Sequence, residues 1–409
     1  MSNEGFLANL VTVWKRQKRN WKVIVVRQWF DRVFQQLTTQ YNSIYIRALG
    51  ATPIQLGIAN STAGVSGALI SAPMGWLQDR YSLRFLFAMG IGLLAVVPLI
   101  YAVAWSWVIT IPAIMLSALA QHEASCGVVC DVCLENRDRG TAKSICEGLG
   151  RIPAIFGPII TAALLTLFGG VNLTGIRPLY IIMFAGEFIL FLFVATQLKE
   201  IERPHIAANS SGFIRSFREI FESGVMLRRW ILLSTINAFT NSMLSAFTYV
   251  YAFELKGAQQ FILGGIATGS ILVQVLFFTP LGTLADRIGR KKVVYVLAPL
   301  FYAANLLFVL AFRPELLLLA GVLLGFQSIS NVIFNAMTPE LVPISFIGRW
   351  RGLLGLFGGI SSLIAPLVGG YVWTYLGPDY IFYMVIASDL FLRMPLLATM
   401  PETLNLKTN

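Results

Sequence analysis

The 409-residue sequence is poor in charged side chains and in cysteine. Asp, Glu, Lys and Arg make up only 12% of it, whereas 56% of its residues are hydrophobic and the mean hydropathy is +0.71. Soluble domains carry about 25% charged and about 45–50% apolar residues, so the composition argues against a water-soluble enzyme. Four cysteines are too few for the disulfide framework of a small secreted protein.

The motifs of several other protein classes are also missing. No GxxxxGK[ST] loop is present, which argues against an ATP-driven pump, and neither HExxH nor a CxxC…CxxC pair occurs. The strict alternation of a membrane β-barrel is absent. His122 and Glu123 are the one catalytic pair that a membrane enzyme would have, and neighbouring helix residues point about 100° apart. We therefore predict a protein that is not an enzyme and has no cofactor.

Long apolar runs are what the sequence does contain. A membrane helix needs about 20 mostly apolar residues, and twelve runs qualify: 23–46, 54–74, 84–104, 107–132, 142–167, 178–198, 229–254, 260–282, 292–312, 315–337, 349–376 and 379–399. The predicted fold class is an all-α membrane protein with twelve transmembrane helices. A polar break divides the chain into an N-terminal tail (1–22), a first six-helix half (23–198), a linker (199–228), a second half (229–399) and a C-terminal tail (400–409).

The basic residues indicate the orientation in the membrane. Of 31 Lys and Arg, 23 lie in the two tails, the linker and the loops on their side, and only Arg47, Arg177, Lys256 and Arg313 lie on the other side. Because cytoplasmic loops are enriched in Lys and Arg, both termini are expected in the cytoplasm. The net charge of +11 then reflects topology and not a nucleic-acid partner. The short outer loops and compact linker favour the inner (plasma) membrane of a prokaryote.

An internal repeat relates the two halves. GWLQDRYSLR begins at Gly75, GTLADRIGRKK begins at Gly282, and Asp79 and Asp286 are 207 residues apart. Arg139-Gly140 and Arg351-Gly352 are 212 apart, and Pro158 and Pro366 are 208 apart. Three similar offsets indicate a duplication, which is common in transporters.

At these residues the chain resembles the major facilitator superfamily. Gly-x-Leu-x-Asp-Arg-x-Gly-Arg-Lys is the signature of that family for loops 2–3 and 8–9; the second copy is complete, and the first has Ser82 and Leu83 in place of Gly and a basic residue. The resemblance covers about the whole chain and implies two pseudo-symmetric halves that rock around a central site. It also implies a gate formed by these loops and their arginine partners: Gly75, Asp79, Arg80, Arg139, Gly282, Asp286, Arg287, Arg290 and Arg351.

Four predicted helices carry stripes of polar side chains. Such side chains are too costly to face lipid, so the stripes must face water or protein. The four helices are the first, fourth, seventh and tenth, and in the resembled family these line the central cavity. The expected cavity residues are Asp31, Arg32, Gln35, Gln36, His122, Cys126, Asn237, Asn241, Gln327 and Asn331. Hydrogen bonds that hold helices together are the alternative explanation of each stripe.

Coupling to protons requires a group that changes protonation. Glu123, beside His122, is the first candidate, and Asp31 is the second because Arg27 and Arg32 could instead hold it in a permanent ion pair. Two further pairs at i, i+4 spacing, Glu147 with Arg151 and Asp389 with Arg393, are expected to satisfy each other. Glu187 has no visible partner in the sequence.

The row His122, Cys126, Cys130 and Cys133 has ligands that suit soft metals. One helix face cannot enclose a metal, so we predict no metal site and treat metal transport as an alternative.

The predicted function is secondary transport of a small organic solute by a monomer in the lipid bilayer, driven by protons. Gly157-Pro158 resembles part of an exporter motif and favours antiport, whereas the arginines of the first helix favour import of an anionic or hydroxylated metabolite. A lipid or amphiphile translocator and a non-transporting receptor are further alternatives.

Overall fold

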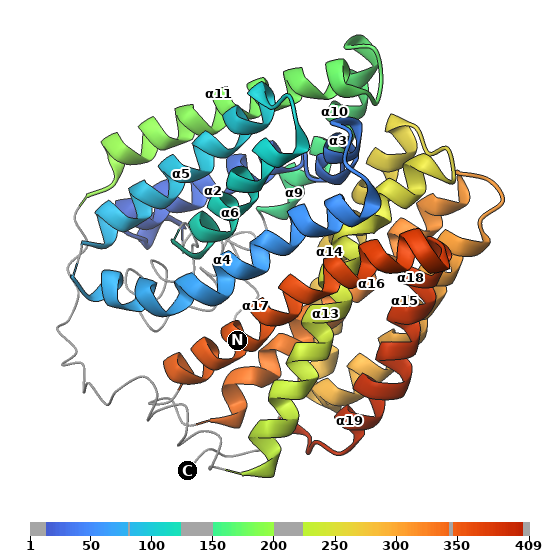
Figure 1. Ribbon diagram of the computed structural model, residues 1–409. Helices are drawn as coiled ribbons and strands as arrows, with labels where there is room; N and C mark the ends of the chain where they lie inside the picture. Colours follow the sequence, from blue (N-terminus) through green and yellow to red (C-terminus); the bar gives the residue numbers. More distant parts are fainter. Residues whose placement is uncertain (1–13, 81, 124–149, 200–223, 343–346, 404–409) are drawn as a thin grey trace.

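The computed structural model describes residues 14–80, 82–123, 150–199, 224–342 and 347–403 (Figure 1). These residues are helical, with no β-strand among them. Helices fill the described chain because a backbone in hydrocarbon must satisfy its own hydrogen bonds.

The described helices of the first half account for parts of all six predicted spans. The first span is α2 (Arg19–Gln35) and α3 (Asn42–Ala48), the second α4 (Pro53–Arg80) and the third α5 (Leu83–Val103). The fourth begins with η1 (Trp107–Ile109) and α6 (Thr110–Glu123), the fifth is α9 (Arg151–Ala154) with α10 (Phe156–Leu167), and the sixth is α11 (Leu173–Gln197).

The second half repeats this order. It comprises α13 (Val225–Glu254), α14 (Gln260–Ile288), α15 (Arg290–Leu310), α16 (Leu316–Met337) with η3 (Thr338–Leu341), α17 (Ile347–Tyr371) with the π-helical η5 (Val372–Leu376), and α18 (Asp379–Ser388), the π-helical η6 (Asp389–Arg393) and α19 (Met394–Ala398). The fold is that of twelve transmembrane helices in two pseudo-symmetric six-helix halves.

Seven of the described helices are long and apolar enough to cross a membrane by length and composition. They include α5, α11, α14, α15, α16 and the two spans after them, and two further apolar helices are shorter. Helix α13 is long enough, but its asparagine and serine residues lower its hydropathy.

The first span is not the continuous helix that the sequence predicts. It begins four residues earlier, at Arg19, and is interrupted between α2 and α3. Thr39 Oγ1 donates to the carbonyl of Gln35 at 2.6 Å, and the amide of Tyr41 donates to Thr38 O at 2.8 Å. Such local bonds to threonine and the shorter i→i+3 turns compete with the α-helical ladder.

We call the side of the bundle at which α2, α13 and α15 begin the basic side, and the opposite side, where α3 and α13 end, the far side. The two halves share one apolar cluster toward the far side, to which Tyr41 and Leu56 of the first half and Phe247 and Tyr251 of the second contribute. Toward the basic side, each half has its own cluster, around Trp21 in the first and around the residues of α13, α15 and α16 in the second. Figure 1 shows the two sets of helices converging at the far side.

Glycines set the closest contact between the halves, where α4 lies along α17. A Cβ atom on Gly57 would collide with the carbonyl of Pro366, and one on Gly370 would lie 2.8 Å from the carbonyl of Pro53. At the basic side, by contrast, Cβ atoms on Gly282 and Gly352 would meet open space. The halves are therefore tightly packed at the far side and more open at the basic side.

Candidate functional site

Three adjacent cavities run from the first half to the basic side. The N-half cavity has a volume of about 240 Å³ and lies among α2, α3, α4, α5, α6 and α11. The central cavity, about 540 Å³, lies between α4, α13 and α17, and the basic-side cavity, about 530 Å³, lies among α13, α16, η3 and α17. Asn60 and Ala63 line both the first and the second, and Ala238, Gly355 and Gly358 line both the second and the third.

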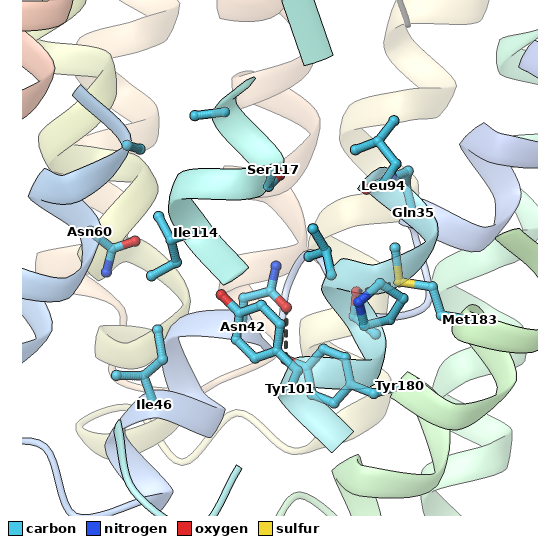
Figure 2. Close-up of a pocket in the computed structure, with 15 residues that line it drawn as sticks. Gln35, Asn42, Ile46, Asn60, Leu94, Tyr101, Ile114, Ser117, Tyr180 and Met183 are labelled. Carbon is cyan, nitrogen blue, oxygen red and sulfur yellow. Dashed lines mark hydrogen bonds between the residues drawn. The ribbon is translucent and has the colours of Figure 1, made fainter. Parts of the chain in front are cut away.

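Amide and phenol groups dominate the polar lining of the N-half cavity. Figure 2 shows Gln35 and Met183 on one side and Asn60 on the other. The rings of Tyr101 and Tyr180 stack with centroids 4.8 Å apart and an interplanar angle of 8°. The Tyr180 hydroxyl donates to Oδ1 of Asn42 at 2.8 Å, which leaves the Nδ2 group of Asn42 available to a solute.

The central cavity is lined by small neutral polar groups. The hydroxyls of Ser242 on α13 and Ser362 on α17 are 2.8 Å apart. Asn241 of α13 lines the same cavity, and its Oδ1 accepts a hydrogen bond of 3.1 Å from Asn331 of α16. The structure therefore brings together two of the residues expected at the cavity, on two of the expected helices.

The basic-side cavity contains the only formal charge on the described lining of the three cavities, Arg351 of α17. Asn237 and Asn335 line it as well. Gln327 is buried within α16. Gln36 lies against Gly157, where a Cβ would come within 2.6 Å of the glutamine Cβ, and Arg32 lies in the last turn of α2.

A buried charged cluster lies one helical turn from the N-half cavity. Nη2 of Arg27 lies 3.2 Å from Oδ1 of Asp31, and the Arg27 side chain is 2% exposed. The guanidinium lies over the ring of Phe87, 5.9 Å from its centroid. Glu187 of α11 is fully buried beside this pair. Asp31 and Gln35 are four residues apart on α2, so the cluster and the cavity share a helix face.

The second half contains its own buried ion pair. Nη1 of Arg393 lies 2.6 Å from Oδ1 of Asp389, and both side chains are at most 2% exposed. Tyr302 donates to Oδ2 of Asp389 at 2.9 Å, and the guanidinium lies over the ring of Phe334. The predicted pairing of Asp389 with Arg393 is confirmed. Since the ion pair lies in the π-helical turn and both of its members are buried, its role is structural.

Several of the expected gate residues lie at the basic side. Asp286 is 63% exposed, and its ion-pair partner in the described part of the chain is Arg290, at 3.5 Å. Arg290 also contacts Glu340 at 2.7 Å. Glu402 accepts hydrogen bonds from the backbone amides of Arg290 and Lys291 at 3.0 and 3.1 Å, so the C-terminal segment anchors the start of α15.

Some predicted site residues lie in the last turns of helices, and others lie outside the described residues. Gly75, Asp79 and Arg80 belong to the last turns of α4, and His122 and Glu123 belong to the last turn of α6. Cys126, Cys130, Cys133, Arg139 and Glu147 lie outside the described residues. Gly282 lies in α14, and Arg287 is exposed near the end of that helix.

An ion pair that sequence reasoning missed closes the far side. Arg47 of α3 binds Glu254 of α13 through two bonds, Nε to Oε1 at 2.8 Å and Nη2 to Oε2 at 3.1 Å. Nη1 of Arg47 also donates to the carbonyl of Ala51. We call this contact the far-side latch, because it joins the ends of the first and seventh spans across the two halves.

Comparisons with known proteins agree with this architecture. The profile of the Major Facilitator Superfamily matches residues 33–268 and 257–398. The uncharacterized MFS-type transporter YhjO of Bacillus subtilis is 25% identical over 240 residues, which cover 57% of each chain. Multidrug resistance protein D of Escherichia coli is 27% identical over 36% of this chain and 37% of its own. Across the curated relatives, the matched region spans between 15% and 57% of the relative's length.

Solved structures show the same fold. A mutant form of the nucleoside transporter NupG superimposes with a TM-score of 0.75 at 16% identity, covering 92% of this chain and 99% of the other. A bacterial homologue of the human lysosomal transporter Spinster, in an inward-facing and unoccupied conformation, gives a TM-score of 0.60 at 14% identity and 96% coverage of both chains. The chain belongs to the Major Facilitator Superfamily, and its fold and relatives are those of secondary transporters of the membrane.

Proposed function

We propose that the protein is a proton-coupled transporter that moves a small organic solute across a bacterial inner membrane by alternating access. The observation that carries the proposal is the buried cluster in which two carboxyl groups, Asp31 and Glu187, lie beside one arginine, Arg27, one helical turn from the Gln35 side of the N-half cavity. Ionisable groups inside a membrane are costly and mark proton or ion pathways. Because the carboxyl group of Asp31 lies so close to the cavity, its protonation is coupled to the binding of a solute there. Asp31 is therefore our proton carrier, with Glu123 on the fourth span as the alternative.

The basic side is proposed to face the cytoplasm, because its loops hold most of the lysine and arginine residues. Both termini and the linker 199–228 then lie in the cytoplasm, between six-helix halves at 23–198 and 229–399. The conformation is inward-facing: the far-side latch and the shared apolar cluster close the outside, and the central and basic-side cavities lie toward the cytoplasm.

The signature loops are proposed to close the cytoplasmic side in the opposite conformation. The exposed carboxylate of Asp286 is available for a new partner when the halves rock. Arg351, on the wall of the basic-side cavity, and Arg139 are the proposed partners of the two loop aspartates, Asp286 and Asp79. Among the described residues, the ion-pair partner that Asp286 has in the present conformation is its own helix neighbour Arg290.

The lining of the cavities favours an uncharged solute. In the N-half and central cavities the described polar groups are carboxamides, hydroxyls and phenols, and none of the described residues that line either cavity is charged. A buried ionic solute needs a counter-charge, whereas amides and hydroxyls match the donors and acceptors of a polyhydroxylated one. The N-half cavity has the volume of about eight water molecules at about 30 Å³ each. A hydroxylated solute of that size fits better than an anion.

The direction of transport is proposed as export by proton antiport. Relatives that match about a third of this chain include Multidrug resistance protein D and the class B tetracycline resistance protein of Escherichia coli. Import by proton symport is the second candidate, and the neutral hydrogen-bonding lining of the cavities favours it.

Proton flux in proteoliposomes with a trapped pH dye tests the proposal. Sugars, polyols, nucleosides, organic anions and lipophilic cations are added one at a time, and the sign of the dye signal separates symport from antiport. We expect one uncharged solute to move protons. The Asp31→Asn variant should exchange that solute in counterflow without moving protons, and the exposed Glu315→Gln variant serves as the matched control. Counterflow without proton movement in the unmodified protein would reject proton coupling, and silence in both assays would reject transport of these solutes.

A further inference from the structure

Helices α2 and α11 pack antiparallel in a register that hydrogen bonds fix near both ends. Nδ2 of Asn20 donates to the carbonyl of Lys199 at 3.1 Å near the basic side. The hydroxyl of Thr38 contacts the sulfur of Met183 at 3.2 Å next to the N-half cavity. Because the two chains run in opposite directions between these contacts, the middle of α2 lies against the middle of α11.

Glu187 lies at this middle position, opposite Asp31. The preceding residue, Gly186, allows the close approach, since a Cβ there would lie 2.5 Å from the ring of Phe34. Glu187 is fully buried, and its carboxyl group is within hydrogen-bonding reach of that of Asp31. Neither carboxyl oxygen of Glu187 has a hydrogen-bond donor in the described part of the chain. Asp31 cannot be that donor while both groups are ionised, because an ionised carboxylate carries no proton.

The charges of this cluster do not balance without a proton. Asp31 and Glu187 would carry two negative charges, and in the described part of the chain the positive group that acts on Glu187 is Arg27. An uncompensated charge buried in a membrane protein costs several kcal/mol, on the order of the penalty for one ion. One proton removes the surplus charge, and a protonated carboxyl group is also the donor that the second carboxylate lacks.

Among the described residues, the other helices packed against α11 supply no further counter-charge. Helix α10 has no charged residue. The charged residue of α5 is Arg84, which donates to the carbonyl of Ala195 nearer the basic side. The charged residue of α3 is Arg47, which is bound to Glu254 at the far side.

We propose that Glu187 and Asp31 together form the proton-binding site of the transporter and share one proton, with Arg27 as the fixed counter-charge of the carboxylate that stays ionised. This inference rests on the proposed function and specifies its coupling site. The proton bridges α2 and α11 through an O–H···O⁻ bond, and its loss leaves two like charges side by side. Repulsion between them then separates the two helices at this level.

The N-half cavity senses this separation because it is built on the same two helices. Gln35 and Met183 line it, and each lies four residues, about one helical turn, from a member of the carboxyl pair. A solute that binds between Gln35 and Met183 and the proton that joins Asp31 to Glu187 therefore act on one interhelical distance. Solute and proton occupancy are coupled by that geometry.

Infrared spectroscopy of the full-length protein tests the shared proton with pH as the only probe. The unmodified protein should show a protonated-carboxyl C=O band that disappears as the pH is raised. Glu187→Gln and Asp31→Asn should each remove the same band, because one proton belongs to both groups, while Glu315→Gln should leave it in place. If the Glu187 variant fails to fold, the Asp31 variant alone decides the result.

The outcomes separate the two proposals. A band that survives both substitutions, or two bands that disappear one by one, overturns the shared site whatever the transport assays show. A band lost as expected, in a protein that moves no protons with any solute of the flux panel, supports the shared site and rejects proton-coupled transport. Loss of both the band and proton flux in Glu187→Gln, with counterflow retained, supports both.

Discussion

Breaking the far-side latch should open the protein to the far side. The latch joins α3 of the first half to α13 of the second by two charge-assisted bonds of 2.8 and 3.1 Å. It can exist only while the halves touch on this side, so it stabilises the present conformation and not the opposite one. Glu254→Gln removes the charge and keeps the shape. The present conformation then loses the free energy of the ion pair relative to the opposite one. The population of the opposite conformation should therefore rise.

The exposure of the two side chains sets the magnitude of this effect. Arg47 is 24% and Glu254 is 28% exposed, so the pair lies between a solvated surface pair and a buried one. Exposed pairs contribute about 0.2–1 kcal/mol, and hydrogen bonds to charged groups about 1.5–3 kcal/mol. A value of about 1 kcal/mol corresponds to a change of about fivefold in the ratio of the two conformations, because about 1.4 kcal/mol is tenfold.

Thiol labelling measures that ratio. In a variant without the four native cysteines, Ser43→Cys places a thiol on α3 at a position that is buried in the present conformation. A membrane-impermeant maleimide added at the far side should modify it about fivefold faster in Glu254→Gln. Glu315→Gln, which removes an exposed acid on the same side, is the matched control, and exchanging the two charges as Arg47→Glu with Glu254→Arg should restore the slow rate. Equal rates in Glu254→Gln and the control would refute the latch.

Three further changes test the gate, the helix contact and the buried ion pair of the second half. Asp286→Asn should slow solute turnover while leaving solute binding in place, and unchanged turnover would remove the proposed gate. Gly57→Leu inserts a side chain where no Cβ fits, so it should weaken the contact between α4 and α17 by about 1–3 kcal/mol. Gly352→Ala, where space is open, should not change the unfolding temperature, which both variants report. Arg393→Met leaves Asp389 charged and unpaired, a loss of about 3–5 kcal/mol that should lower the unfolding temperature strongly, and the addition of Asp389→Leu should recover most of it.

The parts of this architecture that depend on local sequence could be predicted. A span requires about 20 apolar residues in a row, and that property needs no knowledge of distant residues. The pairing of Asp389 with Arg393 was predictable for the same reason, because the helix itself sets the distance between residues four apart. The family followed from the loop around Asp286, since its signature is a short continuous motif.

The break in the first span could not be read from apolar periodicity. Both sides of the break continue the same hydrophobic run, and the interruption depends on hydrogen bonds of the Thr39 hydroxyl and of backbone amides. The row of polar residues from Gln35 to Gln40 was the available signal, because glutamine and threonine weaken the case for a regular lipid-facing helix.

Contacts between distant residues account for what the sequence missed. Arg47 and Glu254 are 207 residues apart, and nothing local to either indicates the other. Glu187 gave a partial signal, since a single carboxyl group inside an apolar run requires a partner, but only the register of α2 and α11 identifies Asp31. Asn60, which lines two cavities, was a polar residue in a run judged by its hydropathy alone.

The first span connects the proton site, the solute cavity and the latch in chain order. Asp31 lies on α2, Arg47 lies on α3, and the interruption between the two helices prevents a rigid transfer of motion from one to the other. The N-half cavity is lined from both sides of the interruption, by Gln35 of α2 and by Asn42 and Ile46 of α3. A solute in that cavity therefore joins the two segments. When the solute is bound, protonation of Asp31 at one end of the span is linked to the latch at the other end. A continuous helix would link the two ends even when the cavity is empty.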